Sequence, residues 1–289
     1  MNATEAVVHF SCRQEQLIGI LHKPDLPGTT GVLIVTGGPQ YRVGSHRQFV
    51  LLARHLAHHG IAAFRFDYRG MGDSTGTAQH FDSIEVDIRS AIDAFSAQSP
   101  GTNEFVLWGL CDAATASAFY AHQDPRVTGL VLANPWVRST RSQAQTHLKH
   151  YFPQRLRQAE FWKKLVSGKL NPIQTARSFL QQLRLANAKQ PVPGTQPGLS
   201  DRMLVTLQHF EGRILLLLSG NDLTASEFAQ VTHQSNAWRE LFNRQQVSRA
   251  ALAQADHTFS SRIWRDQVAD LTLCWLLRES TTDQNADLP

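Results

Sequence analysis

The chain has 289 residues, of which 42% are hydrophobic and 18% charged, and its formal net charge is +4. This length and apolar content suit one large α/β domain with an insertion. No apolar run approaches the roughly 18 residues of a membrane span, and no basic stretch precedes an apolar one at the N-terminus, so we expect neither a transmembrane segment nor a secretory signal. The three cysteines are scattered, which favours free thiols and a cytoplasmic location over a disulfide framework.

Short apolar runs and helical patterns alternate along most of the chain. Two N-terminal runs, at 6–12 and 16–22, alternate like a hairpin of edge strands. Further strands are predicted at 31–36, 61–67, 104–108, 127–133, 213–219 and 247–252, and helices at 45–59, 83–95, 114–120, 226–243 and 261–277. This alternation predicts an α/β fold with a mostly parallel sheet of about eight strands, flanked by helices.

The strand pattern is interrupted in the middle of the chain. No strand is predicted between residues 137 and 199, where basic, glutamine-rich helical stretches are separated by prolines and a glycine. We interpret 137–199 as a helical cap inserted into a core formed by 1–136 and 200–280, and 281–289 as a flexible tail. Eleven basic residues against one acid, Glu160, give the segment 138–190 a net charge of +10. This charge predicts either a solvated surface or a docking face for an anionic partner.

Residues 109–113, with the sequence Gly-Leu-Cys-Asp-Ala, lie between a predicted strand and a predicted helix rich in small residues. A strand, a tight turn with small neighbours and a helix together form a nucleophile elbow, which exposes its central side chain above the sheet edge. The central residue is Cys111, and a thiol at a helix N-terminus with a histidine partner can ionise and attack carbonyl groups. The alternative is a buried cysteine that serves only as a small hydrophobic residue.

Polar residues follow two later strands, and the carboxyl ends of parallel strands meet at one edge of a sheet. Asp222 follows the strand at 213–219, and His257 follows the strand at 247–252. Together with Cys111 they predict a nucleophile, an acid that orients the histidine, and a general base. Two alternatives stay open at this point, because Asp222 also fits a simple turn and Glu227 is a second candidate acid.

Oxyanion-hole donors are expected from two segments. The backbone N–H of Asp112 opens the helix after the elbow, and Gly38 lies in the Gly-Gly-Pro loop that follows the strand at 31–36. Pro39 has no N–H group, so Gln40 is the other candidate in that loop. The charge of the Asp112 side chain complicates the site, because it would raise the pKa of a neighbouring thiol. Substrate contacts are expected from residues beside these loops: Gln40, Leu110 and Phe259.

Neither a metal nor another cofactor is expected. His55 and His59 have the i, i+4 spacing of metal ligands, but no acidic or thiol ligand lies near them in the sequence. The glycines at 38–44 do not form a phosphate-binding loop, because no lysine follows the second one. The basic segment 138–190 lacks a recognised nucleic-acid-binding motif, so nucleic acid is not an expected partner.

The order of nucleophile, acid and histidine resembles that of the α/β-hydrolase superfamily, and the resemblance extends from about residue 6 to residue 278. The Gly-Gly-Pro loop is similar to the superfamily's oxyanion loop, and 67–74 (Asp-x-Arg-Gly-x-Gly-x-Ser) to a turn common in it. More narrowly, 37–47 (Gly-Gly-Pro-Gln-Tyr-Arg-Val-Gly-Ser-His-Arg) and 109–113 together resemble the exosortase A system-associated hydrolases. Those proteins accompany bacterial envelope-protein sorting and exopolysaccharide loci.

This resemblance implies an α/β-hydrolase fold and hydrolytic activity, with three departures from the usual pattern. Cys111 stands in the place of a serine, Asp112 follows it, and Ala113 stands where glycine is usual. Cysteine nucleophiles also occur in relatives such as the dienelactone hydrolases. Ala113 requires only slightly looser packing of the helix against the strand.

The sequence therefore predicts a cysteine-dependent hydrolase or acyltransferase that acts on esters or thioesters. The basic segment favours an anionic acyl donor, such as an acidic acyl carrier protein or coenzyme A. One alternative is a carboxylesterase or lactonase for small molecules, in which the charge of that segment is incidental. Another is a non-catalytic, hydrolase-like scaffold that binds a partner.

Overall fold

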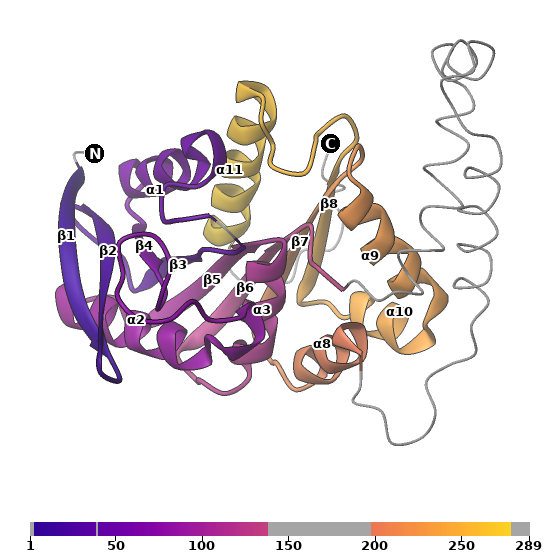
Figure 1. Ribbon diagram of the computed structural model, residues 1–289. Coiled ribbons are helices and arrows are strands. Elements are labelled where there is room, and N and C mark those ends of the chain that lie inside the picture. Colours follow the sequence, from indigo (N-terminus) through magenta and orange to yellow (C-terminus); the bar gives the residue numbers. More distant parts are fainter. Residues whose placement is uncertain (1–2, 39, 138–197, 279–289) are drawn as a thin grey trace, which may run out of the picture.

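A computed structural model describes residues 3–38, 40–137 and 198–278 of the chain (Figure 1). Within these ranges, eight strands form one sheet in the order β1-β2-β4-β3-β5-β6-β7-β8. The edge strands β1 (Ala3–Cys12) and β2 (Glu15–Pro24) pair antiparallel, and β2 pairs antiparallel with β4. All other neighbouring strands are parallel, which confirms the predicted fold class of an eight-stranded, mostly parallel sheet with flanking helices.

The parallel strands carry apolar side chains on both faces of the sheet. In β3, Val32 and Ile34 pack on one face and Leu33 and Val35 on the other, and all four are fully buried. Burial on both faces explains why these strands have nearly continuous apolar sequences instead of alternating ones. The parallel part comprises β3 (Thr30–Val35), β4 (Ala62–Asp67), β5 (Glu104–Leu110), β6 (Val127–Ala133), β7 (Arg213–Ser219) and β8 (Val247–Leu252).

Helices cover both faces of the sheet (Figure 1). Apolar side chains of α1 (Gln48–His58) and α11 (Arg262–Leu277) join the core on one face. The core on the other face is formed with α2 (Glu85–Gln98), α3 (Asp112–Ala121), α8 (Leu199–Gln208), α9 (Leu223–Gln234) and α10 (Asn236–Phe242). Two short 3-10 turns, η1 (Ser45–Arg47) and η2 (Phe81–Ser83), precede α1 and α2.

Two predicted helices differ from those observed. The helix expected at 45–59 begins regularly only at Gln48, because His46 and Arg47 have positive φ angles of 53° and 59°. The helix expected at 226–243 is two helices, α9 and α10. They are separated at Ser235, whose backbone is extended and whose hydroxyl accepts the N–H of Trp238. Although the apolar periodicity continues through Ser235, this serine caps and starts a second helix.

The predicted cap at 137–199 lies, from residue 138 to residue 197, outside the described residues, and so does the predicted tail at 281–289. On either side of the gap the chain belongs to the sheet domain, since Val137 and Leu207 are both buried in the same core cluster. No helix in the described part of the chain is long and apolar enough to cross a membrane.

Candidate active site

A sharp turn between β5 and α3 exposes Cys111 at the carboxyl edge of the sheet. Cys111 has φ 63° and ψ −122°, a strained conformation for a residue with a side chain. The turn requires a glycine two residues earlier, in β5, because a Cβ atom on Gly109 would lie 2.6 Å from backbone atoms of Ala113. The Cys111 N–H donates to the carbonyl of Ala133 on β6, at 2.9 Å, and this bond anchors the turn to the neighbouring strand. The geometry is that of a nucleophile elbow.

His257 lies between Asp222 and Cys111, although these residues are far apart in the sequence. Its Nδ1 atom is 2.8 Å from Oδ2 of Asp222. Burial alone would lower the pKa of His257, but hydrogen bonds with Asp222 and with the Cys111 side chain, and their negative charges, raise it to about 10. This arrangement stabilises an imidazolium beside the sulfur atom.

The Asp222 carboxylate also forms the N-cap of α9. It accepts hydrogen bonds from the backbone N–H groups of Thr224, at 3.1 Å, and Ala225, at 3.0 Å. Glu227, the alternative acid in the sequence, is a buried residue of α9, and Asp256 accepts the N–H of Ser260 at 2.9 Å. Asp222 is thus the carboxylate that holds the Nδ1 atom of His257.

Asn134, which follows β6, connects the ends of three strands. Its Nδ2 atom donates to the hydroxyl of Ser219, at 2.9 Å, and to the carbonyl of His257, at 3.0 Å. Its Oδ1 atom accepts the N–H of Ser219, at 2.8 Å. Asn134 directly follows the strand predicted at 127–133, and the sequence predicted no functional role for it. The signal for its role is an asparagine directly after a buried strand, because asparagine tolerates the positive φ angle of 44° found here.

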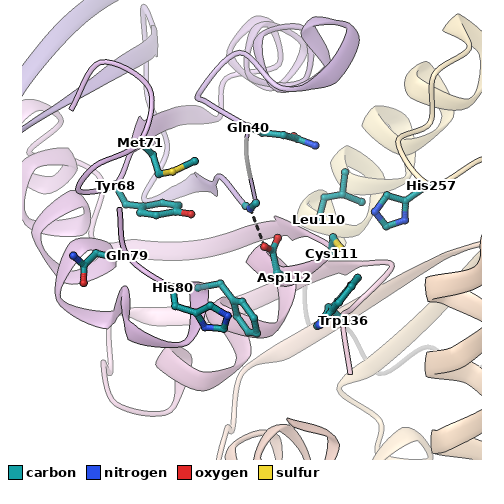
Figure 2. Close-up of a pocket in the computed structure, with 13 residues that line it drawn as sticks. Gln40, Tyr68, Met71, Gln79, His80, Leu110, Cys111, Asp112, Trp136 and His257 are labelled. Carbon is teal, nitrogen blue, oxygen red and sulfur yellow. Dashed lines mark hydrogen bonds between the residues drawn. The ribbon is translucent and has the colours of Figure 1, made fainter. Parts of the chain in front are cut away.

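The loop after β3 meets the elbow directly, through Gly38 and Asp112. The Gly38 N–H donates to Oδ2 of Asp112 at 2.8 Å (Figure 2). The Ala113 N–H donates to Oδ1 of the same carboxylate at 2.9 Å. The approach is so close that a Cβ atom on Gly37 would lie 2.1 Å from the same Oδ1 atom. Gly38, an expected oxyanion donor, therefore lies at the elbow but donates to a side chain. The N–H of Gln40 instead closes a turn onto the carbonyl of Gly37, at 3.3 Å.

An ion-pair network anchors this loop to the end of β4. Asp67 is fully buried and accepts the backbone N–H of Arg42 at 2.6 Å, and it also pairs with the Arg42 guanidinium. The same guanidinium lies 2.7 Å from Asp73. The hydroxyl of Ser74 donates to the carbonyl of Asp67 at 2.7 Å, so the segment 67–74 forms a turn. This turn holds Asp67 in position to bind the loop after β3.

A pocket of about 660 Å³ opens in front of Cys111 (Figure 2). Gln40 and Leu110, two expected substrate contacts, line it together with Asp112 and His257. The other lining residues are the aromatic and apolar Tyr68, Met71, Phe81 and Trp136, the polar Gln79 and His80, and Gly37, Gly38 and Cys111. Its walls are thus mainly apolar, with the reactive groups gathered at one end.

Phe259, the third expected substrate contact, does not line this pocket. It is 1% exposed and packs in the core between α1 and α11, beside Trp108 and Leu52. The expectation rested on its position two residues after His257, and the chain turns inward there, with φ 50° at Phe259. Its role is therefore to hold the loop that carries His257.

The three cysteines differ in exposure, and all are free. Cys12 is 1% exposed, and burial raises the pKa of its thiol. Cys274 is exposed on α11, and Cys111 is intermediate. The rings of His55 and His59 are in contact, with centroids 4.6 Å apart and planes tilted by 45°. The described residues contain no group of three or more His, Cys, Asp or Glu side chains suited to a metal ion.

Comparison with known proteins places this geometry in a family. Residues 32–247 match the family described as serine aminopeptidase, S33. No curated protein sequence matches the chain. Solved structures with a similar fold include an esterase of Pyrococcus furiosus, with a TM-score of 0.65 and 13% identity over 95% of this chain and 90% of that one. They also include the Butyrivibrio proteoclasticus protein Est1E with bound ferulic acid, with a TM-score of 0.61 and 12% identity over 93% and 98% of the chains. A third is the esterase domain of a Rhodothermus marinus protein, with a TM-score of 0.58 and 18% identity over 94% and 97% of the chains.

The match to the family model extends from β3 to β8 and includes the elbow. The chain therefore belongs to the serine aminopeptidase S33 family of the α/β-hydrolase superfamily, with a cysteine at the centre of its elbow.

Proposed function

We propose that this protein hydrolyses acyl esters or thioesters, with Cys111 as nucleophile, His257 as general base and acid, and Asp222 as the acid that orients the histidine. One observation carries the proposal: a single imidazole contacts Asp222 through Nδ1 and also hydrogen-bonds the cysteine of a strained elbow. An inert, buried cysteine has no need of a strained backbone or of a paired histidine. A non-catalytic scaffold would not need this pairing either.

The chemistry follows from these contacts. The imidazolium of His257 holds the proton of the nucleophile while Cys111 Sγ attacks the acyl carbon, and the carbonyl electrons move onto oxygen. The tetrahedral intermediate collapses, the bond to the leaving alcohol or thiol breaks, and the imidazolium protonates that group. Water then loses a proton to His257 and attacks the thioester of the acyl-enzyme, which releases the acid and restores Cys111. Asp222 stabilises the imidazolium in both halves of the cycle.

The pocket supports an apolar acyl group. Tyr68, Met71, Phe81 and Trp136 present apolar surface next to the elbow, where an alkyl or aryl chain would leave water. The net charge of +10 in the sequence at 138–190 favours an anionic donor, such as an acyl carrier protein or an acyl coenzyme A. A small neutral ester is the alternative substrate, favoured by the apolar lining alone.

A narrower assignment follows from motif resemblance. The segments 37–47 and 109–113 resemble the exosortase A system-associated hydrolases, so we also propose a link to bacterial exosortase and exopolysaccharide loci. The genes that flank this one test the link, because the proposal requires exosortase or polysaccharide-synthesis genes among them.

Replacement of the nucleophile tests the proposed function. We expect Cys111→Ala to abolish turnover of p-nitrophenyl acetate and of an acyl thioester, with a melting temperature close to that of the wild type, because the turn tolerates small residues. Cys111→Ser should keep at most weak esterase activity, since a hydroxyl is a poorer nucleophile beside this histidine. Cys274→Ala is the matched control, because that thiol is exposed on α11, and it should change nothing. Full activity in Cys111→Ala would exclude the mechanism.

The acyl-enzyme gives a second test. With an activated thioester, the intact mass of His257→Ala should show an acyl adduct on Cys111 that persists longer than in the wild type, because water lacks its general base. Equal lifetimes in the two proteins would remove His257 from deacylation.

A further inference from the structure

The side chain of Asp112 lies where a substrate's oxygen would be expected. In the proposed reaction, the developing oxyanion needs N–H donors from the start of α3 and from the loop after β3. Both expected donors already have a partner, because the Gly38 N–H donates to Oδ2 of Asp112 at 2.8 Å and the Asp112 N–H donates to its own carboxylate. The N–H of Ala113 donates to Oδ1 of the same carboxylate, at 2.9 Å. An anion thus occupies the oxyanion hole in the absence of substrate.

We propose that Asp112 is an internal ligand of the oxyanion hole, which must leave before a substrate carbonyl oxygen can enter. The inference rests on the proposed attack by Cys111, because only that reaction places an oxyanion at Gly38. It makes Asp112 a specificity-determining residue, which sets the rate at which different acyl groups gain access to the same nucleophile.

The competition favours the carboxylate over a neutral substrate. Hydrogen bonds to an ionised acceptor are about twice as strong as those to a neutral one. A ground-state ester carbonyl is neutral, so it binds these donors less tightly than Asp112 does. The substrate oxygen binds them as tightly as the carboxylate only when it becomes the tetrahedral oxyanion. Part of the substrate's binding energy is therefore spent on moving the side chain, and substrates with larger apolar acyl groups supply more of it.

The surroundings of Asp112 allow this movement. The carboxylate is half-buried at the pocket of about 660 Å³, and it forms no salt bridge with any described residue. The ionisable groups that face it are Cys111, Tyr68 at the end of β4, His80 before η2, and His257. Burial raises the pKa of Tyr68 to about 12, to which the charge of Asp112 contributes, so this phenol stays neutral. Moving the carboxylate away from Gly38 therefore breaks hydrogen bonds but no ion pair with a described residue.

Two other roles for Asp112 predict different behaviour. If Asp112 served only to hold the loop at Gly37 and Gly38 in place, its uncharged isostere asparagine would preserve that function. A catalytic carboxylate would be needed for turnover, and both neutral variants would then lose activity. The proposed internal ligand is distinguished by a gain of activity on removal.

The test compares Asp112→Ala and Asp112→Asn with the wild type in hydrolysis of p-nitrophenyl acetate. We expect kcat/KM to rise about tenfold in Asp112→Ala, the factor that separates a charge-assisted from a neutral hydrogen bond. Asp112→Asn should lie between the two, since its amide oxygen can accept from Gly38 but carries no charge. A fall in Asp112→Ala, whether or not Asp112→Asn retains activity, overturns the proposal.

A second measurement needs no turnover. Acetate added to Asp112→Ala should fill the vacated position and shift the Gly38 backbone amide resonance in a saturable way, whereas neutral acetamide should not. In the wild type, where Asp112 holds that amide, acetate should leave the resonance unchanged. Absence of a saturable shift in Asp112→Ala overturns the inference. If turnover instead persists when Cys111→Ala is added to these variants, the proposed function fails, and the Gly38 titration still decides the role of Asp112.

Discussion

At the scale of single residues, Asp222 shows how one carboxylate can set the charge state of a neighbour. Burial raises the pKa of Asp222, but its hydrogen bond to His257, the charge of that imidazole and two backbone N–H groups together lower it below the usual value. The pKa of His257 is raised in turn, to about 10. The pair therefore stabilises the folded state over the pH range in which Asp222 is ionised and His257 is protonated.

Replacing Asp222 with asparagine should reverse the shift at His257. The amide keeps an acceptor for the cap of α9, but the charge is gone, so burial dominates and lowers the pKa of His257, which ¹⁵N NMR of the imidazole measures. A histidine with a raised pKa contributes stability that is fully present below its ordinary pKa of 6.5 and is lost as pH rises through about 10. The difference in melting temperature between wild type and variant should therefore be largest near pH 6 and vanish above pH 10.

Activity should fall along with that pKa. We expect Asp222→Asn to lose about 10⁴-fold in kcat, as when the orienting acid of a serine triad is replaced by its amide. Asp256→Asn is the control, because Asp256 adjoins His257 but contacts Ser260 instead. A loss in the control as large as in Asp222→Asn would contradict the assignment of Asp222.

A neutral side chain at 112 should stabilise the protein, and the gain should depend on pH. Burial raises the pKa of Asp112 above its ordinary 3.8, only partly offset by its backbone donors, so ionisation opposes folding once pH exceeds that value. The melting temperature of Asp112→Asn should exceed that of the wild type at pH 7, and the two should agree near pH 3, where both side chains are neutral. A larger gain at pH 3 than at pH 7 would contradict this cause.

Sequence alone brings Cys111, Asp222 and His257 to one sheet edge, because each follows a strand and parallel strands end together. It does not reveal the contact between Gly38 and Asp112, which are 74 positions apart and meet through a backbone N–H that has no sequence signature. Nor does it predict the burial of Phe259, which depends on a left-handed turn after Asp256.

At the scale of elements, the elbow depends on how closely α3 crosses β5. The first turn of α3 passes over Gly109 at a distance that leaves no room for a methyl group. Gly109→Ala should therefore lower the free energy of unfolding by about 1–3 kcal/mol, as expected for overpacking at a rigid contact, and reduce kcat by displacing Cys111. Denaturant titration and the esterase assay measure the two effects.

The matched control is Gly101→Ala in the loop before β5, where an added Cβ would meet no atom within 4 Å. It should change neither stability nor kcat appreciably. If both variants behave alike, the crossing distance is not what shapes the elbow.

Strand positions were predictable because apolar runs bounded by polar residues mark buried strands. Helix boundaries were less so, since they depend on local hydrogen bonds. The single helix predicted at 226–243 ignores the cap at Ser235, and the start predicted at Ser45 ignores two residues with left-handed backbone. In both places the helical periodicity continues in the sequence although the backbone does not.

At the scale of the whole molecule, charge is distributed unevenly along the sequence, and this asymmetry yields a prediction about substrate class. If the net +10 at 138–190 attracts an anionic donor, kcat/KM for an acyl coenzyme A should fall as salt rises, because screening acts within about 8 Å at physiological ionic strength. A short neutral ester should respond little. Lys163→Glu with Lys164→Glu should reproduce the loss at low salt, for the charged donor alone.

Equal salt dependence for both substrates would favour the small-molecule esterase instead. The two lysines lie outside the described residues, so this prediction rests on sequence charge. The mostly parallel architecture, by contrast, was predictable in full outline from the alternation of strands and helices, since each crossover returns the chain to the same sheet edge.

The three cysteines differ in exposure, so their reaction with a thiol reagent can be used to follow unfolding. An aromatic disulfide such as Ellman's reagent should modify Cys274 at once and Cys111 at a rate set by access to the pocket, while Cys12, 1% exposed at the end of β1, stays protected until the sheet edge opens. The folded chain then releases two equivalents of chromophore and the denatured chain releases three. The number of reactive thiols during heating therefore reports opening of the β1–β2 edge, and the modification rate of Cys111 reports access to the pocket.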